Sequence, residues 1–232
     1  MSERIQRALY RKVEYSQMQW ALLKQKRAQA MEVLEIFNKH NLSAYLYGSL
    51  ARGDVHKNSD IDLAFLYRLP TYKIEFLLNQ KGYQNYRREI IMATPGDAVK
   101  LYIYLNELIA ITLPLTKLSK TSLEFYDFGG KIDYKGIREN KRVPGIDKRL
   151  VLITPQSYGH EERSVINQEN IAAKEVGVAI ETIYERERVL LRREKYGRTG
   201  VFLKRELSKQ ETPEGVLETL ARKNPIIRKK IY

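Results

Sequence analysis

The chain has 232 residues, and its 41 Lys and Arg against 28 Asp and Glu give a formal net charge of +13. The absence of cysteine excludes a disulfide framework, a Cys-ligated zinc finger and an iron–sulfur site. Hydrophobic residues make up 43% of the chain, no apolar run approaches the roughly 20 residues of a membrane span, and no signal peptide opens the sequence. We therefore expect a globular, cytoplasmic protein with no membrane contact.

The positive charge is a hint about partners. Excess Lys and Arg on a chain that can form a core fits contact with phosphates, either of a nucleic acid or of a nucleotide. A generally basic proteome would produce the same excess, so the charge alone does not choose between the two readings.

The first half of the chain predicts a long helix followed by a small sheet. Residues 15–40 lack Gly and Pro, and their apolar side chains recur at helical spacing. Short apolar runs bounded by turn residues then indicate strands. We expect, in chain order, a helix over 15–40, strands over 42–47 and 61–66, a short helix over 72–79, and a meander of strands over 89–93, 99–105 and 108–113.

The character of the sequence changes after residue 116. Gly129-Gly130, Gly136 and Pro144-Gly145 indicate a loop-rich connector. Beyond it we expect a strand over 149–153 and a helical region over 167–196 that contains a single glycine, Gly177. These patterns predict a first domain over 1–120, a connector over 121–145 and a smaller second domain over 146–232.

Two carboxylates stand at the head of the second predicted strand. Asp60 and Asp62 are two residues apart, so on a strand both point to one face. Their mutual repulsion is relieved when a cation lies between them, and Mg²⁺ is the divalent ion that oxygen ligands of this kind suit best. Alternatively, both are solvent-facing residues of an amphipathic strand whose other face carries Ile61, Leu63 and Phe65.

A glycine and a hydroxyl close the strand that precedes this pair. Gly48 lets backbone N–H groups approach a phosphate closely, and Ser49 adds a hydroxyl donor. A phosphate cradle that faces a metal-binding Asp pair is the arrangement of a phosphoryl-transfer site.

In these residues the sequence resembles the DNA polymerase β-like nucleotidyltransferases in their minimal form. The resemblance is carried by Gly48-Ser49, Ala51-Arg52-Gly53 and Ser59-Asp60-Ile61-Asp62, covers roughly residues 31–66 and extends plausibly to Pro114. It implies an α+β fold, with a small mixed sheet and flanking helices, that transfers a nucleotidyl group from an NTP to a hydroxyl with Mg²⁺ or Mn²⁺. It also implies that Asp60 and Asp62 hold the metals, that Gly48 and Ser49 hold the β- and γ-phosphates, and that Arg52 steadies them.

The sequence departs from this family at the third carboxylate. The family places that acid on a later strand, but residues 108–114 contain none. The nearest candidate for a catalytic role is Glu107, and Asp97, Asp127 and Asp133 are more distant ones. An alternative function is therefore a DNA-binding regulator or antitoxin-like protein with a vestigial transferase domain. An RNA-binding accessory protein is a third.

The C-terminal half resembles a winged helix-turn-helix. A short helix carrying Ala173 would turn at Gly177 into a second helix from Ile180, and strands over 189–193 and 201–205 would flank a glycine-containing wing tip. The resemblance implies a nucleic-acid partner, DNA or RNA, whose phosphates contact Arg192, Arg193, Lys195 and Arg198. The alternative is one long helix over 168–196. The oligomeric state is left open.

His160 is the remaining residue with possible acid–base chemistry. No second histidine lies near it in the sequence, so we expect an ordinary surface histidine.

Overall fold

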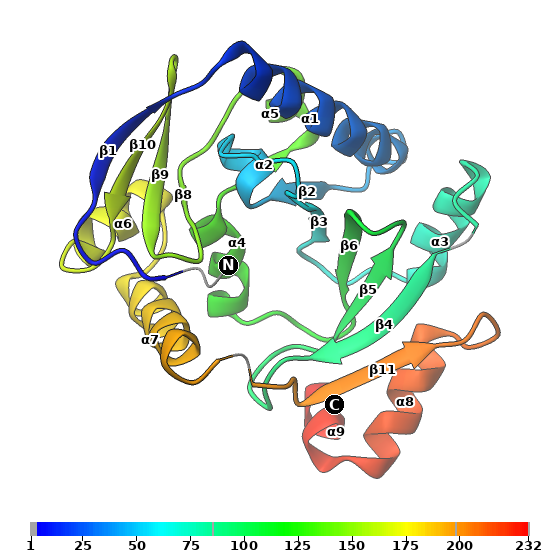
Figure 1. The fold of residues 1–232 in the computed structure, drawn as a ribbon. Helices are drawn as coiled ribbons and strands as arrows, with labels where there is room; N and C mark the ends of the chain where they lie inside the picture. The colour runs from blue at the N-terminus through cyan, green and yellow to red at the C-terminus, as the bar shows by residue number, and fades with distance from the viewer. Residues whose placement is uncertain (1–3, 85, 198, 232) are drawn as a thin grey trace.

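The structure is a computed structural model that describes residues 4–84, 86–197 and 199–231. Its strands form two sheets, seen side by side in Figure 1, with orders β11-β4-β5-β6-β3-β2-β7 and β1-β10-β9-β8. The strands are β1 Tyr10–Glu14, β2 Ala44–Tyr47, β3 Ile61–Phe65, β4 Arg87–Met92, β5 Lys100–Tyr104, β6 Ile109–Pro114, β7 Lys131–Asp133, β8 Gly145–Ile146, β9 Val151–Gln156, β10 Gly159–Ser164 and β11 Leu203–Leu207. The helices are α1 Gln17–Asn38, α2 Ser49–Arg52, α3 Thr71–Gln80, α4 Lys120–Gly129, α5 Tyr134–Arg138, α6 Glu169–Val176, α7 Ile180–Tyr196, α8 Pro213–Lys223 and α9 Pro225–Ile231.

The larger sheet is mixed, as the sequence predicts. β2 pairs antiparallel with β3, and β3 pairs parallel with β6. Along β3 the side chains of Ile61, Leu63 and Phe65 are fully buried in the core, and the alternation of a strand turns Asp62 to the opposite face. One face of the sheet therefore packs in the apolar core, and the side chain of Asp62 lies on the other face.

Helix α1 covers the apolar face of this sheet. It begins at a capping box in which Ser16 and Gln19 exchange side-chain-to-backbone hydrogen bonds. Its residues Ala30, Val33 and Phe37 are fully buried, and the Phe37 ring meets the Phe65 ring edge-on at 5.0 Å. The predicted helix over 15–40 is thus confirmed with nearly the same bounds.

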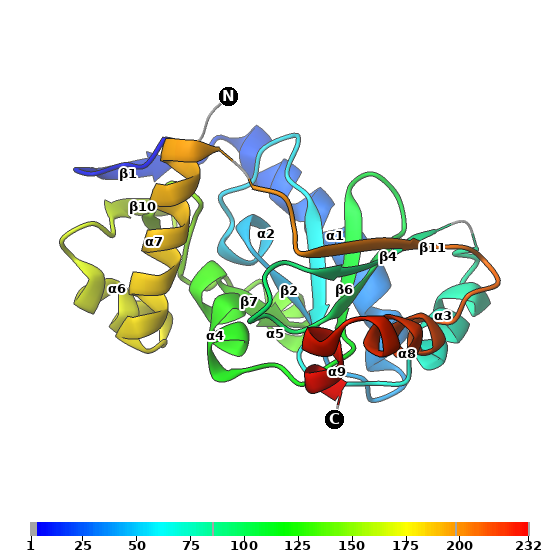
Figure 2. The same cartoon turned by 90° about the horizontal axis from the view of Figure 1, so that it is seen from below.

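The C-terminal segment returns to the larger sheet. β11 pairs antiparallel with β4, and Leu207, Leu217 and Ile227 are buried in the same core as α1. Figure 2 shows the chain leaving α7 and running back along β4 as β11. The predicted wing is therefore wrong. Residues 189–193 lie inside α7, which continues to Tyr196, and the strand near 201–205 pairs with the edge of the larger sheet.

The smaller sheet takes its edge strand from the N-terminal segment. β1 pairs antiparallel with β10, and Ile5 is buried in a second core with Leu150, Val165 and Ile183. Strand β1, which lies before the predicted boundary at 120, thus pairs in the second sheet, and β11, which lies after the predicted start at 146, pairs in the first. The predicted domain bounds stay a prediction. Among the described residues, no helix is long and apolar enough to cross a bilayer.

Helix α4 lies where the sequence predicts a loop-rich connector. The expected loop is wrong here because the Gly129-Gly130 pair ends a helix: Gly130 caps α4 with φ 80° and donates its N–H to Asp127. Phe128 packs into the second core, and Tyr126 packs on the other side against Ala64 of β3. Helix α4 therefore joins the two halves of the molecule.

The two C-terminal helices that the sequence predicts are present. Gly177 ends α6 in the left-handed conformation, with φ 72°, and α7 begins at Ile180. The alternative of one helix over 168–196 is excluded.

Candidate functional site

A cavity of about 760 Å³ lies between the two sheets. The larger sheet and its loops contribute Gly48, Ser49, Arg52, Asp60 and Asp62 to its lining; the second sheet and α7 contribute Asp147, Lys148, Arg149, His160, Glu162, Arg186 and Arg193. The predicted glycine–serine turn and the predicted carboxylate pair thus open onto one space.

Strand pairing explains why these two motifs meet. Tyr47, the last residue of β2, is the register partner of Asp62. Because the two strands are antiparallel, the residues after Tyr47 lie beside the residues before Asp62. The turn at Gly48-Ser49 is therefore adjacent to Asp60, and this follows from a four-residue strand and its register alone.

The carboxylate of Asp62 is held in an environment that opposes its charge. Burial first, and the neighbouring Asp60 second, raise the pKa of Asp62 to about 6, while Lys148 from the opposite wall acts in the other direction. Asp60 itself is exposed. A cation bound between the two carboxylates would relieve both the repulsion and the cost of burial.

Gly48 adopts a backbone conformation that favours glycine. Its φ is 83°, and a Cβ placed on it would meet nothing within 4 Å. Glycine is therefore favoured here because of the dihedral angle, and not because a side chain would lack space. The Gly48 amide donates to the Gly130 carbonyl at 2.9 Å, so this N–H fixes the turn to the β7 side of the sheet. The predicted phosphate contacts then depend on the amide and hydroxyl of Ser49, at the start of α2.

Two buried cations of α1 position these motifs, and the sequence analysis missed both. Lys26 is 5% exposed and donates to the Ser59 carbonyl at 2.6 Å, next to Asp60. Arg27 is 6% exposed and donates to the carbonyls of Leu50 and Ala51 in α2, each at 2.9 Å. The signal was available, because both cations fall on the apolar face of a predicted amphipathic helix.

Arg52 lines the cavity but has protein partners. Its guanidinium donates to both carboxylate oxygens of Asp54, at 2.9 and 2.8 Å, and to the Gly129 carbonyl at 2.6 Å. In this structure Arg52 connects α2 to the end of α4, and its predicted phosphate contact stays a prediction.

The structure does not bring Glu107 into the cavity lining. Glu107 is exposed in the turn between β5 and β6, and the register partner of Asp62 on β6 is Ala110. Within the ranges that the structure describes, no group of three or more His, Asp or Glu side chains could hold a metal ion. Asp60 and Asp62 are therefore the carboxylates that remain as candidate metal ligands, without a third acid grouped with them among the described residues.

The wall that faces the carboxylate pair carries three cations for which the described residues provide no ion pair: Lys148, Arg186 and Arg193. Arg186 lies over the Phe125 ring at 4.9 Å, and its buried Nε has no hydrogen-bond partner in the described part of the chain. Burial first, and Arg193 second, lower the pKa of Arg186. A desolvated guanidinium beside two exposed cations favours an anionic ligand.

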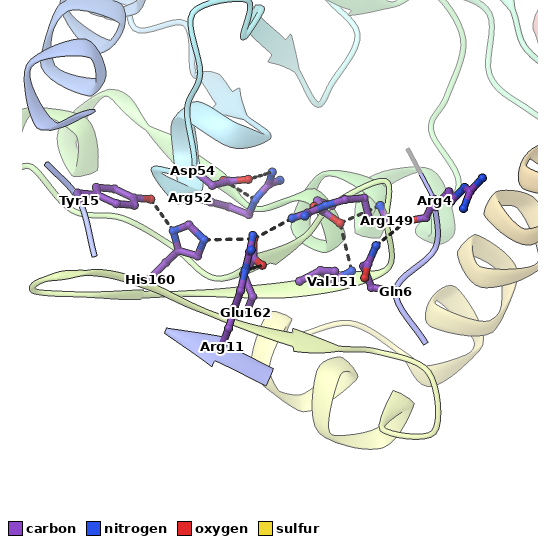
Figure 3. Close-up of polar contacts among 11 residues, drawn as sticks. Arg4, Gln6, Arg11, Tyr15, Arg52, Asp54, Arg149, Val151, His160 and Glu162 are labelled. Carbon is purple, nitrogen blue, oxygen red and sulfur yellow. Dashed lines mark hydrogen bonds and ion pairs between the residues drawn. The ribbon is translucent and has the colours of Figure 1, made fainter. Parts of the chain in front are cut away.

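Other cations of the cavity are neutralised within a network, which Figure 3 shows. Tyr15 Oη lies 2.7 Å from His160 Nδ1, and His160 Nε2 lies 3.4 Å from Glu162. Arg149 donates to Glu162 at 2.8 Å and to Asp147 at 2.6 Å. The expectation of a surface His160 is wrong: the residue is 4% exposed, because β1 and Tyr15 cover β10.

The predicted nucleic-acid contacts are only partly placed by the structure. Arg192, Arg193 and Lys195 are exposed on the last turns of α7, and of these Arg193 lines the cavity. Arg198 lies outside the described residues.

Comparison with known proteins gives one finding. Residues 29–125 match the family model described as a nucleotidyltransferase domain. This range runs from α1 through both motifs to α4, and the match supports nucleotidyl transfer as the general activity of this part of the chain. Neither the curated proteins nor the solved structures gave a match.

Proposed function

We propose that the cavity transfers a nucleotidyl group from an NTP to a hydroxyl acceptor, with release of pyrophosphate. The observation that carries the proposal is the half-buried Asp62, whose pKa is raised, beside Asp60 and the Gly48-Ser49 turn. The facing wall carries Lys148, Arg186 and Arg193, for which the described residues provide no ion pair. The match of residues 29–125 to the nucleotidyltransferase domain supports the reaction type.

The donor set of the cavity fits Mg²⁺ or Mn²⁺. Mg²⁺ prefers oxygen ligands and is commonly held by one or two carboxylates together with substrate phosphates. Asp60 and Asp62 supply those carboxylates. The raised pKa of Asp62 indicates that burial and the charge of Asp60 disfavour its ionised form when no cation is bound. When bound there, the ion would neutralise phosphate charge.

The remaining residues bind and orient the nucleotide. The Ser49 hydroxyl and amide contact the phosphates on one side, and Lys148, Arg186 and Arg193 neutralise them on the other. The acceptor hydroxyl oxygen forms a bond to the α-phosphorus and releases its proton to solvent. The bond from that phosphorus to the bridging oxygen breaks, and pyrophosphate leaves with the electron pair. Cations that face the leaving phosphates stabilise the charge that develops on them.

A nucleic acid is the partner that the rest of the cavity favours. Arg192, Arg193 and Lys195 form an exposed basic end on α7 next to the cavity mouth. Phosphate contacts dominate nucleic-acid affinity, so these side chains would hold an acceptor close to the site.

The test combines a thermal shift with label transfer. Mg²⁺ plus NTP should raise the midpoint of thermal unfolding of the wild type by mass action, and Asp60→Asn together with Asp62→Asn should abolish the rise. NTP labelled at the α-phosphate should label an acceptor pool, and the same double variant should not. Asp127→Asn, which removes an acid outside the cavity, is the matched control. An unchanged thermal shift in the double variant contradicts the site assignment.

One observation favours the alternative function, a DNA-binding regulator or antitoxin-like protein with a vestigial transferase domain: the described residues place no third acid in a group with Asp60 and Asp62. This alternative predicts NTP-dependent stabilisation without label transfer across acceptor pools of RNA, DNA and protein. Glu107→Gln tests whether Glu107 is the third acid of an active transferase. Transfer that survives this change proceeds with Asp60 and Asp62 alone, and transfer that is lost in Glu107→Gln but kept in Asp127→Asn makes Glu107 the third acid.

A further inference from the structure

One row of register partners runs from the carboxylate pair across the larger sheet. Asp62 pairs with Ala110 of β6, Ala110 with Tyr104 of β5, and Tyr104 with Arg87 of β4. Neighbouring strands are about 4.8 Å apart, and Ala110 contributes only a methyl group. Tyr104 is therefore the first large side chain beyond Asp62 in this row, on the same face of the sheet.

Two tyrosines and two cations are fixed together on this face. The rings of Tyr102 and Tyr104 are stacked, with centroids 6.2 Å apart and planes 18° apart, and the Arg87 guanidinium lies 4.3 Å above the Tyr104 ring. Glu89 is 2% exposed and pairs with Arg87 at 2.6 Å and with Lys204 of β11 at 3.2 Å. We call Arg87, Tyr102, Tyr104 and Lys204 the tyrosine strip.

The cations of the strip remain accessible. The side chains of Arg87 and Lys204 are 49% and 56% exposed, and both pair with the buried carboxylate of Glu89. The exposed Glu206, which pairs in register with Glu89, marks the outer edge of the strip on β11. Burial first, and the charge of Asp62 second, raise the pKa of Tyr102 to about 12, so the inner end of the strip lies close to the candidate site.

This face differs from the rest of the sheet in its chemistry. The opposite face is apolar and covered by helices, whereas the strip offers partly exposed rings, a guanidinium plane and an ammonium group. Aromatic rings on an open sheet stack on unpaired bases, Arg planes do the same, and neighbouring cations hold the backbone phosphates. A duplex offers no free base faces, so it cannot use the rings.

We propose that the tyrosine strip binds the single-stranded end of a nucleic-acid acceptor and directs it to the site at Asp62. The proposal rests on the proposed transferase function and names its acceptor class. The bases stack on Tyr102 and on the Arg87 plane that lies over the Tyr104 ring, and Lys204 contacts the backbone. Ala110 carries only a methyl group and separates the rings from Asp62 in the register row.

The test measures binding without any NTP, by fluorescence anisotropy with short labelled single-stranded RNA and DNA oligonucleotides. Tyr104→Ala should weaken binding about 5- to 150-fold, the range expected for the loss of one stacked base. Tyr104→Phe keeps the ring and should bind as the wild type does. Tyr72→Ala removes an exposed tyrosine from α3, outside the strip, and is the matched control. Lys204→Gln, which removes the proposed contact to the backbone, should reduce the slope of log affinity against log salt by about 0.7.

Three outcomes would contradict single-strand binding by the tyrosine strip. In the first, Tyr104→Ala binds the single strand as tightly as the wild type does. In the second, the matching duplex binds as tightly as the single strand or more tightly, and Tyr104→Ala weakens both equally; in the third, Tyr104→Ala loses the Mg²⁺–NTP stabilisation while its oligonucleotide binding is unchanged. The last result would assign the rings to the base of the NTP. Failure of the proposed function looks different, because oligonucleotide binding would persist while Mg²⁺–NTP stabilisation and label transfer were absent.

Discussion

At the scale of single residues, Glu162 shows how one buried carboxylate organises a wall of the cavity. It is 3% exposed and is contacted by Arg11, Arg149 and His160. Burial alone raises the pKa of Glu162, but the hydrogen bonds from His160 and the two arginines outweigh burial and hold the pKa far below its usual value of 4.5. The ionised carboxylate is therefore a source of folding stability.

Replacing this carboxylate should produce a pH-dependent loss of stability. A depressed pKa in the folded state contributes stability above the unfolded pKa of 4.5, and the contribution shrinks as the pH falls below that value. Glu162→Gln should lower the free energy of unfolding by about 1–3 kcal/mol near neutral pH, measured in urea. The gap to the wild type should narrow as the solution is acidified below about pH 4.5.

The control for this measurement is Glu14→Gln, an exposed residue of β1 that should change stability by no more than about 0.5 kcal/mol. A gap between Glu162→Gln and the wild type that stays constant from neutral to acid pH would show that the ionised carboxylate is not its source.

At the scale of elements, α1 is both a core helix and the support of the site. Its apolar residues hold the sheet, while Lys26 and Arg27 reach through the same face to backbone carbonyls that precede Asp60 and lie in α2. Neither cation has a carboxylate partner among the described residues, so their hydrogen bonds to carbonyls are what offset burial. The helix therefore transmits its position directly to both motifs.

Lys26→Met tests this role, because methionine fills a similar volume and cannot donate to the Ser59 carbonyl. We expect a loss of about 1–3 kcal/mol in unfolding free energy from the unsatisfied carbonyl. We also expect a smaller Mg²⁺–NTP thermal shift, because the segment before Asp60 loses its anchor. Lys24→Met, exposed on the same helix, should leave both measurements nearly unchanged. A normal NTP shift in a destabilised Lys26→Met would limit Lys26 to a structural role.

The elements also show where sequence reasoning works. The sequence predicts α1, β2, β3 and β4 to β6 well, because each has a clear apolar period and turn residues at its ends. It misses β1, because Val13 is the only apolar side chain of this strand apart from the aromatic Tyr10. The segment therefore shows no alternation of apolar and polar residues from which a strand could be predicted. It also assigns Val201–Arg205 to a wing, because a strand's propensity is local whereas its partner, here β4, is fixed by tertiary packing.

The same distinction applies to the site. Gly48, Ser49, Asp60 and Asp62 form local motifs and can be named from the sequence. The cationic wall cannot, because Lys148 and Arg186 have no pattern that separates them from Arg149, which is neutralised by Asp147 and Glu162 only in the folded chain.

At the scale of the whole molecule, the two halves exchange their ends. β1 from the first half completes the second sheet, and β11, α8 and α9 from the second half complete the first core. The cavity takes one wall from each half, so its geometry depends on both exchanges.

The exchange predicts that the fragments 1–145 and 146–232 do not fold separately. Fragment 1–145 lacks buried residues such as Leu207, Leu217 and Ile227, each contributing about 1.5–3 kcal/mol, against a typical total stability of about 5–15 kcal/mol. Each fragment alone should show no cooperative thermal unfolding by circular dichroism, and mixing the two should restore a transition. Cooperative unfolding of fragment 1–145 alone would establish it as an independent domain.

The pairing of β11 with the edge of β4 also sets an order on folding during synthesis. The chain leaves the ribosome from its N-terminus, so β4 emerges long before the strand that covers its edge. Until β11 is synthesised, the edge of β4 is unpaired in the nascent chain. Likewise β1 has no strand partner until β10 is synthesised. Native closure of both sheets is thus a late event that depends on contacts distant in sequence, which slows folding and gives chaperones a defined intermediate to protect.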